Sequence, residues 1–293
     1  MTLREAVEMG ASCLAGLPQG GRDAELLLLR AIGRGRSFLM AHPEAELDFR
    51  QLEQYRRWLK RRAAHEPIQY ITGEQEFFGL NLRVTTAVLI PRPETEHLVE
   101  ALLARVPRDQ PLRIVDVGSG SGAIAIALAH SLPQAALTAL DLSPAALEIA
   151  RENAAQHGLA ERVRCVESDL LAAVTGERFD AVVSNPPYIA DTEELEPQVF
   201  DYEPRAALFA GPTGMEIYRR LIPQARQALE PGGWLVLEIG FGQREAVGCL
   251  LEGWEDVTFL PDLQGIPRVA AARARFAHSD SIFGNGVDRS HEP

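Results

Sequence analysis

The apolar stretch 179–184 runs directly into the tetrapeptide Asn185-Pro186-Pro187-Tyr188. The side-chain oxygen of Asn185 and the carbonyl oxygen of Pro186 are two acceptors that can bind both N–H bonds of a planar NH2 group. The prolines fix φ and restrict Asn185 to extended geometry, so both acceptors are held in place before a ligand arrives. Tyr188 offers a flat face for stacking of an amide or a nucleobase. The tetrapeptide therefore predicts a loop that holds a planar nitrogen.

Such a nitrogen is a poor nucleophile, because its lone pair is delocalised into the neighbouring π system. Two acceptors that bind its N–H bonds orient the nitrogen and raise its electron density. Catalysis is then mostly proximity and alignment for in-line displacement at a sulfonium methyl group, which requires neither a metal nor a strong base. We expect the catalytic residues to be Asn185, Pro186 and Tyr188, and we expect no metal site. The competing interpretation is a proline-stiffened turn after a strand.

A glycine-rich turn follows the strand-like stretch 113–117 and makes a second candidate site. Its residues are Asp116-Val117-Gly118-Ser119-Gly120-Ser121-Gly122. Glycines at such a turn allow a tight bend and a close approach of the backbone to a ligand. Further along the chain, Asp141 ends the next strand-like stretch, where a carboxylate can accept both hydroxyls of an adenosine ribose. The pattern indicates a nucleoside cofactor.

Two cofactors fit this turn. Gly118, Gly120 and Ala123 also match the dinucleotide fingerprint, and Asp141 would serve NAD equally well. Asp116 favours the other choice, because a carboxylate there would repel a pyrophosphate but suits the ammonium group of a methionine moiety. We therefore predict S-adenosylmethionine, with S-adenosylhomocysteine as product. An NAD-dependent reductase or a simple cofactor-binding module remains the alternative of another class.

Asp169 and Leu170 follow the third strand-like stretch, 163–167. The carboxylate of Asp169 is placed to accept from the adenine amino group while Leu170 packs on the ring. Taken alone, Asp169 is better explained as a helix N-cap. Asn185 completes the predicted cofactor contacts, because it follows the fourth strand.

After Pro111 the chain alternates between strand and helix patterns, which indicates a mainly parallel sheet with helices on both faces. If the fourth strand lies beside the first, the tetrapeptide loop meets the cofactor at the carboxyl ends of the strands. The predicted strands are 113–117, 136–140, 163–167, 179–184, 234–239, 257–260 and 268–274, and the predicted helices are 94–105, 123–130, 144–157 and 215–228.

The first 70 residues read as short amphipathic helices, among them one from Asp23 to Ile32 and one from Asp48 to His65. The second helix carries a basic run that is either a solvated face or a docking surface for an acidic or RNA-associated partner. Stretch 68–90 has β-type residues broken by glycines and predicts a hairpin connector. Stretch 277–293 is polar and predicts a disordered tail. The basic run comprises Arg56, Arg57, Lys60, Arg61 and Arg62.

Composition narrows the class of protein further. The net charge of −12 argues against a dedicated binder of nucleic-acid backbone, because such proteins gain affinity by neutralising phosphates. An apolar leader and a membrane-length apolar run are both absent from the sequence. The three cysteines lie far apart, which suits a reducing compartment. We expect a cytoplasmic monomer that binds neither membrane nor DNA directly.

Several motifs together resemble the family of peptide chain release factor glutamine N5-methyltransferases, also known as the PrmC or HemK family. N6-adenine methyltransferases and ribosomal-protein glutamine methyltransferases share the Asn-Pro-Pro-Tyr tetrapeptide, but the combination is specific to this family. The resemblance extends from the early helices to about residue 275. It is carried by Arg61-Arg62 with Pro67, Tyr70-Ile71 and Gly73, by Phe77-Phe78-Gly79, by segments 89–96, 116–122 and 183–189, and by Tyr202-Glu203-Pro204 with Ala207-Leu208.

The resemblance implies an α/β fold: a Rossmann-like, seven-stranded S-adenosylmethionine methyltransferase domain (91–276) preceded by a small helical substrate-recognition domain (1–70) and a β-hairpin connector (71–90). It implies that the acceptor is the glutamine of the Gly-Gly-Gln loop in class I bacterial release factors. Segment 91–96 resembles the family's lid-forming element. The implied cofactor residues are Gly118, Ser119, Gly120, Ser121, Gly122, Asp141, Leu170 and Asn185, and the implied amide-binding residues are Asn185, Pro186, Pro187 and Tyr188.

One position departs from the family's pattern, because Leu170 stands where relatives often have an aromatic residue. That exchange puts in doubt the strength of packing on the adenine ring. Glutamine methylation of a ribosomal protein and N6-adenine methylation of RNA or DNA remain alternative activities, since all three acceptors carry a planar NH2 group.

Overall fold

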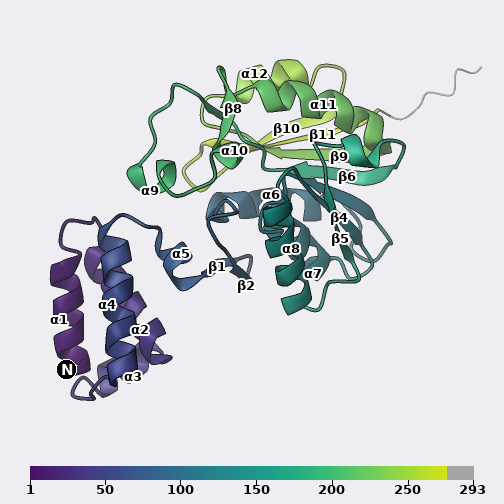
Figure 1. The fold of residues 1–293 in the computed structure, drawn as a ribbon. Helices are drawn as coiled ribbons and strands as arrows, with labels where there is room; N and C mark the ends of the chain where they lie inside the picture. The colour runs from purple at the N-terminus through teal and green to yellow at the C-terminus, as the bar shows by residue number, and fades with distance from the viewer. Residues whose placement is uncertain (276–293) are drawn as a thin grey trace, which may run out of the picture.

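The computed structural model describes residues 1–275. The predicted tail at 277–293 lies outside the described residues. Figure 1 shows a group of helices at the N-terminus that stands apart from a larger α/β unit, with α5 and the β1–β2 hairpin between them.

Four helices build the N-terminal group: α1 (Leu3–Cys13), α2 (Gly20–Ile32), α3 (Arg36–Ala41) and α4 (Phe49–Ala63). Thr2 and Asp48 cap α1 and α4 in reciprocal capping boxes, and Gly33 ends α2 in the left-handed conformation at φ 63°. The two helices predicted here are confirmed, although α2 begins at Gly20 rather than Asp23. Their core is apolar, with Leu3, Leu14, Leu27, Leu28, Tyr55 and Leu59 almost fully buried.

The basic run on α4 is not one uniform face. Arg62 is buried and pairs with buried Asp23 of α2 at 2.7 Å, and Arg61 donates to Glu66 at 2.7 Å. Arg62 also reaches Gln198 of the larger unit at 3.5 Å. Arg61 and Arg62 therefore form ion pairs within the fold, so the solvated-face interpretation does not apply to these two of the five basic side chains.

Replacement of Arg62 with methionine should destabilise the N-terminal helices by about 3 kcal/mol, because it leaves the carboxylate of Asp23 buried without its cation. Native-state hydrogen exchange of amides in α2 and α4 measures the loss. The double variant Asp23→Leu/Arg62→Met should recover most of it. A single variant as stable as the parent would show that the pair adds nothing.

The connector differs from the predicted 68–90 hairpin in its first part. Residues Ile68–Thr72 form a helix, α5, which begins after Pro67 and ends at Gly73 with φ 80°. The prediction of β structure for this stretch was wrong, because its β-type residues pack on the helical core through Ile71. The hairpin itself consists of β1 (Glu74–Phe77) and β2 (Leu80–Arg83). Its turn has left-handed backbone at both central residues, as a two-residue hairpin requires.

The larger unit contains one seven-stranded sheet in the order β10-β11-β9-β6-β3-β4-β5. Only β11 pairs in antiparallel fashion, with β9 and with β10, so the sheet is mixed and mainly parallel as predicted. The strands are β3 (Arg113–Val117), β4 (Ala136–Asp141), β5 (Val163–Glu167), β6 (Phe179–Ser184), β9 (Leu229–Glu238), β10 (Glu255–Pro261) and β11 (Pro267–Arg273).

Helices cover both faces of this sheet. In Figure 1, α6 (Glu96–Leu103), α7 (Ala123–Ser131) and α8 (Pro144–Gln156) lie on one side, and α11 (Glu216–Ala228) and α12 (Arg244–Leu250) lie on the other. Alternate strand residues face opposite cores, as the two-residue period of a strand demands. Ile114 and Val183 belong to the first core, whereas Val115 and Val182 belong to the second.

The structure also contains short elements that the sequence pattern did not predict. Four of them follow the tetrapeptide, and two precede it in the chain. They are η1 (Pro93–Thr95), η2 (Ala172–Val174), β7 (Ile189–Ala190), α9 (Pro197–Phe200), α10 (Arg205–Leu208) and β8 (Phe209–Gly211). The helix predicted from Glu94 accordingly begins as the 3-10 helix η1. Within residues 1–275, every helix is too short or too polar to cross a bilayer.

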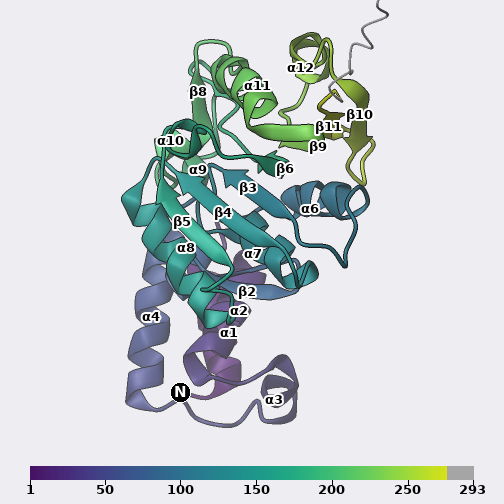
Figure 2. The same ribbon diagram turned by 90° about the vertical axis from the view of Figure 1, so that its right-hand side faces the viewer.

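The fourth strand of the unit, β6, pairs directly with the first, β3, which confirms the adjacency on which the site prediction depended. Figure 2 shows β3, β4 and β5 side by side, with α9 and α10 near the edge at which β3 ends. The glycine-rich turn after β3 and the tetrapeptide after β6 therefore leave the sheet at the same edge.

Candidate active site

The glycine-rich turn is fastened to the neighbouring strand by its backbone. The N–H groups of Gly118 and Ser119 both donate to the carbonyl oxygen of Leu140, at 2.8 and 2.9 Å. Gly122 has φ 80°, and a Cβ there would lie 3.1 Å from the Cβ of Ala150. The turn thus needs glycine for its backbone conformation and for its packing on α8.

Asp141 is held in place at the end of β4. Its two carboxylate oxygens accept from the backbone N–H groups of Gly120, at 2.8 Å, and Ser143, at 2.9 Å. Each oxygen has a further lone pair, so the carboxylate can still accept hydroxyl groups of a ligand. The arrangement fixes the carboxylate beside the glycine-rich turn, as the sequence predicts for a ribose acceptor.

A cavity of about 420 Å³ opens at this edge of the sheet. It brings together both candidate motifs, because its lining includes residues from the turn, from the ends of β4 and β5 and from the tetrapeptide. Ser119, Ser121 and Gly122 shape the turn but do not line this cavity. The predicted site residues that do line it are Gly118, Gly120, Asp141, Asp169, Leu170, Asn185, Pro186 and Pro187.

Asp116 lies beneath the turn and is fully buried. Its Oδ2 accepts from the N–H of Ala125 at 3.2 Å, while its Oδ1 and the hydroxyl oxygen of buried Ser119 have no partner among residues 1–275. Desolvation raises the pKa of Asp116 to about 7, against the effect of the Ala125 hydrogen bond. Unpartnered acceptors below the turn fit a cofactor that brings a donor, such as an ammonium group.

Asp169 does not cap a helix. Its Oδ2 accepts from the guanidinium of Arg220 of α11 at 2.6 Å, whereas the cap position of η2 is Leu171. The N-cap interpretation was therefore wrong, because a long-range cation binds the carboxylate. Leu170 has left-handed backbone at φ 51° and is half-buried against the second core.

Asn185 is oriented by a hydrogen bond from its amide group. Its Nδ2 donates to the hydroxyl oxygen of Thr95 at 3.0 Å, and Thr95 in turn donates to Glu238 at 2.5 Å. The side-chain oxygen of Asn185 is consequently left for a ligand. The backbone of the preceding Ser184 is fixed through its hydroxyl, which donates to the Val117 carbonyl at 2.6 Å.

Tyr188 is anchored at both ends. Its hydroxyl donates to Glu238 at 3.3 Å, and its carbonyl oxygen accepts from the side chain of Gln243 at 2.9 Å. Burial raises the pKa of Tyr188, so the phenol keeps its proton and remains a donor. Gly214, at φ 74°, leaves room for this anchor, because a Cβ there would lie 2.5 Å from the Tyr188 carbonyl oxygen.

A second cavity, of about 120 Å³, lies beside the tetrapeptide. Asn185 and Pro186 line both cavities, and Tyr188 lines only the smaller one. The two predicted amide acceptors therefore lie where a space fit for a nucleoside adjoins a small space beside an aromatic ring. Leu89 and Ala207 also line both cavities. The rest of the smaller lining comes from Leu89, Arg92, Ile189, Val199, Ala207 and Leu208.

A groove of about 710 Å³ runs between the N-terminal helices and the larger unit. Leu17, Arg62 and His65 line it on one side, and Arg92 and Val199 on the other. The last two also line the smaller cavity, so the groove leads toward Asn185.

Thr95, Glu238, Arg92 and Glu203 were not predicted as site residues. Glu238 is 2 % exposed in a strand with an apolar pattern, and that one acidic residue among apolar neighbours was a usable signal. Arg92 pairs with buried Glu203, which also accepts from the N–H of Ile90 at 3.1 Å. Both residues belong to the motifs that carry the family resemblance, but 111 positions separate them in the chain.

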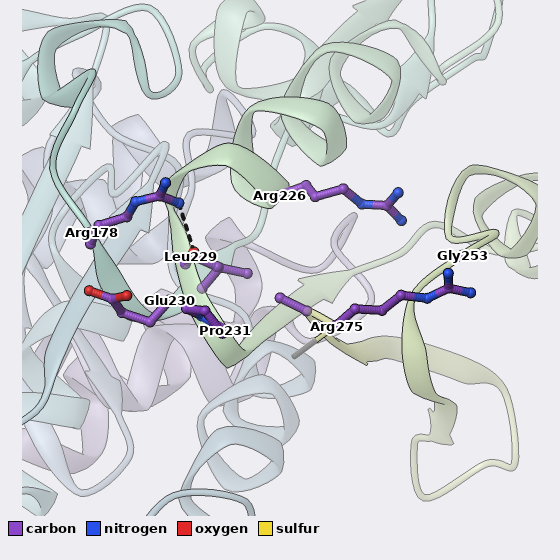
Figure 3. A pocket seen from close by; sticks show the side chains of 8 residues that line it. Arg178, Arg226, Leu229, Glu230, Pro231, Gly253 and Arg275 are labelled. Carbon is purple, nitrogen blue, oxygen red and sulfur yellow. Dashed lines mark hydrogen bonds between the residues drawn. The ribbon is translucent and has the colours of Figure 1, made fainter. Parts of the chain in front are cut away.

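A further cavity, of about 410 Å³, lies at the opposite edge of the sheet, where β6 and β9 begin and β11 ends. Figure 3 shows three arginines around it, Arg178, Arg226 and Arg275. Arg178 donates to the Leu229 carbonyl at 3.0 Å, and Arg226 donates to the Glu252 carbonyl at 3.0 Å. Arg178 thus binds the start of β9, and Arg226 of α11 binds the turn after α12. The lining of this cavity shares no residue with the two cavities at the candidate active site.

Two family models match the chain. The Methyltransferase small domain model matches residues 94–201, and the PrmC N-terminal domain model matches residues 5–73. The first match contains the glycine-rich turn and the tetrapeptide, and the second contains the N-terminal helices and α5.

Curated relatives are similar over nearly the whole chain. The chain is 45 % identical over 278 residues to a release factor glutamine methyltransferase of Koribacter versatilis, covering 93 % of this chain and 99 % of the relative. It is 43 % identical over 274 residues to a release factor glutamine methyltransferase of Escherichia coli, covering 92 % and 97 %.

Among solved structures, the chain resembles a T. thermophilus 16S rRNA N2 G1207 methyltransferase in complex with AdoMet and guanosine. The TM-score is 0.52 at 20 % identity, and the match covers 69 % of this chain and 50 % of that one. At this identity the likeness supports the methyltransferase fold alone.

Proposed function

The chain belongs to the family of release factor glutamine methyltransferases, and we propose that it methylates the glutamine side-chain nitrogen in the Gly-Gly-Gln loop of class I release factors. The observation that carries this proposal is that Asn185 and Pro186 line both the larger and the smaller cavity. A methyl donor in the larger cavity and an amide nitrogen in the smaller one would meet beside these two acceptors.

The cofactor we propose is S-adenosylmethionine, whose sulfonium carries the methyl group to be displaced. Asp141 would hold the ribose, the Asp116–Gly122 turn would hold the methionine end, and Asp169 and Leu170 would face the adenine. Leu170 offers a smaller surface than an aromatic ring, and the carboxylate of Asp169 is shared with Arg220. We therefore expect most of the affinity to come from Asp141 and the turn.

We expect the amide site to prefer glutamine over glutamate. The Asn185 side-chain oxygen and the Pro186 carbonyl oxygen accept hydrogen bonds and cannot donate them. A glutamine NH2 group supplies two donors, whereas a glutamate carboxylate would place its charge against two acceptors. Tyr188 closes the smaller cavity and can pack against the planar amide. The chain's own residues thus bind and align the nucleophile, and alignment supplies most of the catalysis.

The groove between the two parts of the chain is our proposed path for the release-factor loop. It reaches the smaller cavity at Arg92 and Val199, and the N-terminal helices line its outer part. A protein acceptor suits a chain with net charge −12 better than DNA does, since a phosphate backbone would be repelled. We propose a monomer as the active form.

Incubation of the protein with labelled S-adenosylmethionine and purified class I release factor should transfer one methyl group to the loop glutamine. Mass spectrometry of the loop peptide locates the label. A release factor with Gln-to-Ala in the Gly-Gly-Gln loop is the matched control, and unchanged incorporation into it would refute the proposal. Label recovered instead in a ribosomal protein, or in adenine of RNA or DNA, would assign the alternative acceptors.

Cofactor binding should depend on pH because of Asp116. The pKa of its carboxyl is raised to about 7 in the free protein, and a nearby ammonium group would favour the ionised form and lower that pKa. Binding below pH 7 must then release a proton, so affinity should be about tenfold weaker at pH 6 than at pH 8. Isothermal titration calorimetry measures the slope. Asp116→Asn should remove it, and a slope that survives would exclude this role.

A further inference from the structure

Glu238 is a buried carboxylate that lines neither cavity, yet it binds Tyr188 directly and is linked to Asn185 through Thr95. It ends β9 and is 2 % exposed. One of its oxygens accepts from the Thr95 hydroxyl at 2.5 Å, and the other accepts from the Tyr188 hydroxyl at 3.3 Å. Thr95 then accepts from the Asn185 amide at 3.0 Å. A chain of hydrogen bonds therefore leads from the carboxylate to Asn185.

The direction of these bonds decides which atom of Asn185 faces a ligand. A threonine hydroxyl has one proton, and an ionised carboxylate can only accept. The proton of Thr95 must therefore point to Glu238, so its oxygen can only accept from Asn185. Asn185 can donate to the Thr95 oxygen only through Nδ2. Its Oδ1 therefore points away from Thr95 and is left for a ligand.

We propose that Glu238 and Thr95 are positioning residues that keep the oxygen of Asn185, rather than its NH2 group, facing the acceptor amide. The proposal rests on the proposed role of Asn185 as an acceptor for the glutamine NH2 group. An Asn185 turned by 180° would oppose its own NH2 group to that of the substrate and would lose the bond that aligns the nucleophile.

Several charged and polar groups surround Glu238. Arg268 of β11 favours its ionised form, Glu94 of η1 opposes it, and Tyr188 and Thr95 donate to it. Tyr218 of α11 donates to its backbone carbonyl at 2.9 Å. Desolvation is the largest influence and raises the pKa of Glu238 to about 7.

Protonation of Glu238 reverses the chain of bonds. A carboxylic acid can donate to Thr95, whose hydroxyl proton then becomes free to point at Asn185 and to favour its oxygen. Because the folded pKa is raised, the carboxyl is ionised above about pH 7 and protonated below it. Methyl transfer should therefore fall as pH decreases through 7.

Thr95→Val tests the link with an isosteric side chain, and Thr95→Ser is its matched control, since serine keeps the hydroxyl. We expect Thr95→Val to lower kcat by about 10- to 100-fold with KM for the release factor and cofactor affinity nearly unchanged. Thr95→Ser should retain at least half of the parental kcat. Equal kcat for the valine variant and the parent would overturn the proposal, as would a serine variant as impaired as valine.

The pH profile separates positioning from a general loss of stability. The parent should show an acid limb near pH 7 in kcat, and both Glu238→Gln and Thr95→Val should lack it. A limb that persists in both variants would contradict the role of Glu238.

A spectroscopic measurement distinguishes failure of this inference from failure of the proposed function, because it needs no substrate. The side-chain NH2 resonances of Asn185, assigned with Asn185→Ala, should titrate near pH 7 in the parent and not in Thr95→Val. If they titrate but no release factor is methylated, the proposed function fails and the positioning chain stands. If the parent methylates release factor but these resonances do not titrate, the positioning chain fails alone.

Discussion

The Asn185→Ala variant should lose methyl transfer by about 100- to 1,000-fold while its affinity for S-adenosylmethionine stays within about threefold of the parent. Alanine removes the side-chain acceptor that aligns the amide nitrogen, but it leaves the Pro186 carbonyl and the backbone of the loop. The cofactor contacts that we propose to contribute most, at Asp141 and the glycine-rich turn, follow other strands. Single-turnover kinetics with release factor and calorimetry with cofactor measure the two quantities separately.

The matched control is Asn81→Ala, which removes an exposed asparagine of the β2 strand that donates to Glu74 at 2.9 Å. It should leave both quantities unchanged. An Asn185→Ala variant with more than about a tenth of parental activity would rule out the amide-binding role, since loss of a single positioned acceptor in a closed site costs more than that.

Asp141→Asn should weaken S-adenosylmethionine binding by about 100-fold. Both oxygens of Asp141 accept backbone N–H groups, from Gly120 and Ser143. An asparagine must direct its NH2 group at one of these donors, which breaks a hydrogen bond and displaces the turn. The loss of a charged acceptor for the ribose adds to this, and hydrogen bonds to a charged group contribute about 1.5–3 kcal/mol each. A tenfold change in affinity corresponds to about 1.4 kcal/mol.

Calorimetric titration with S-adenosylhomocysteine measures this change without turnover. Asp180→Asn is the matched control, because Asp180 also accepts a backbone N–H, from Arg113 at 2.7 Å, but belongs to β6 and is remote from Asp141 in the chain. If both variants bound equally well, Asp141 would not hold the ribose and the orientation of the cofactor would need revision.

Much of the sheet could be predicted from the sequence, because its signals are local. Strands β3, β5 and β6 have the predicted bounds, since each is an apolar stretch ended by a turn or a charged residue. The glycine-rich turn was recognisable because its backbone requires left-handed residues, and three of its glycines adopt them. The adjacency of β6 and β3 followed from the general ordering of doubly wound sheets.

What could not be predicted depends on partners that are distant in the chain. Residues 68–72 have β-type side chains, but they form a helix that begins after Pro67, ends at Gly73 and packs on the helical core. Asp169 has a good capping residue type, but Arg220 binds its carboxylate from 51 positions away. Local propensity is a weak guide where tertiary contacts compete with it.

The same limit applied to the candidate site. Asn185 was recognisable from its prolines, but its orientation depends on Thr95 and Glu238, which lie 90 and 53 positions away. No spacing rule connects those three residues. The residues that we propose to contact ligands could therefore be named from their types and spacing, whereas the hydrogen bonds that orient them required the fold.

The position of Asn185 and Pro186 where the two cavities adjoin also bears on the order of events in turnover. The larger cavity is bounded by Leu142, Ser143 and Asp169, and the smaller one continues into the groove between the two parts of the chain. A nucleoside and a protein loop that occupy these spaces would arrive by separate routes. We therefore expect that binding has no compulsory order and that spent cofactor can be exchanged while the protein acceptor is still bound.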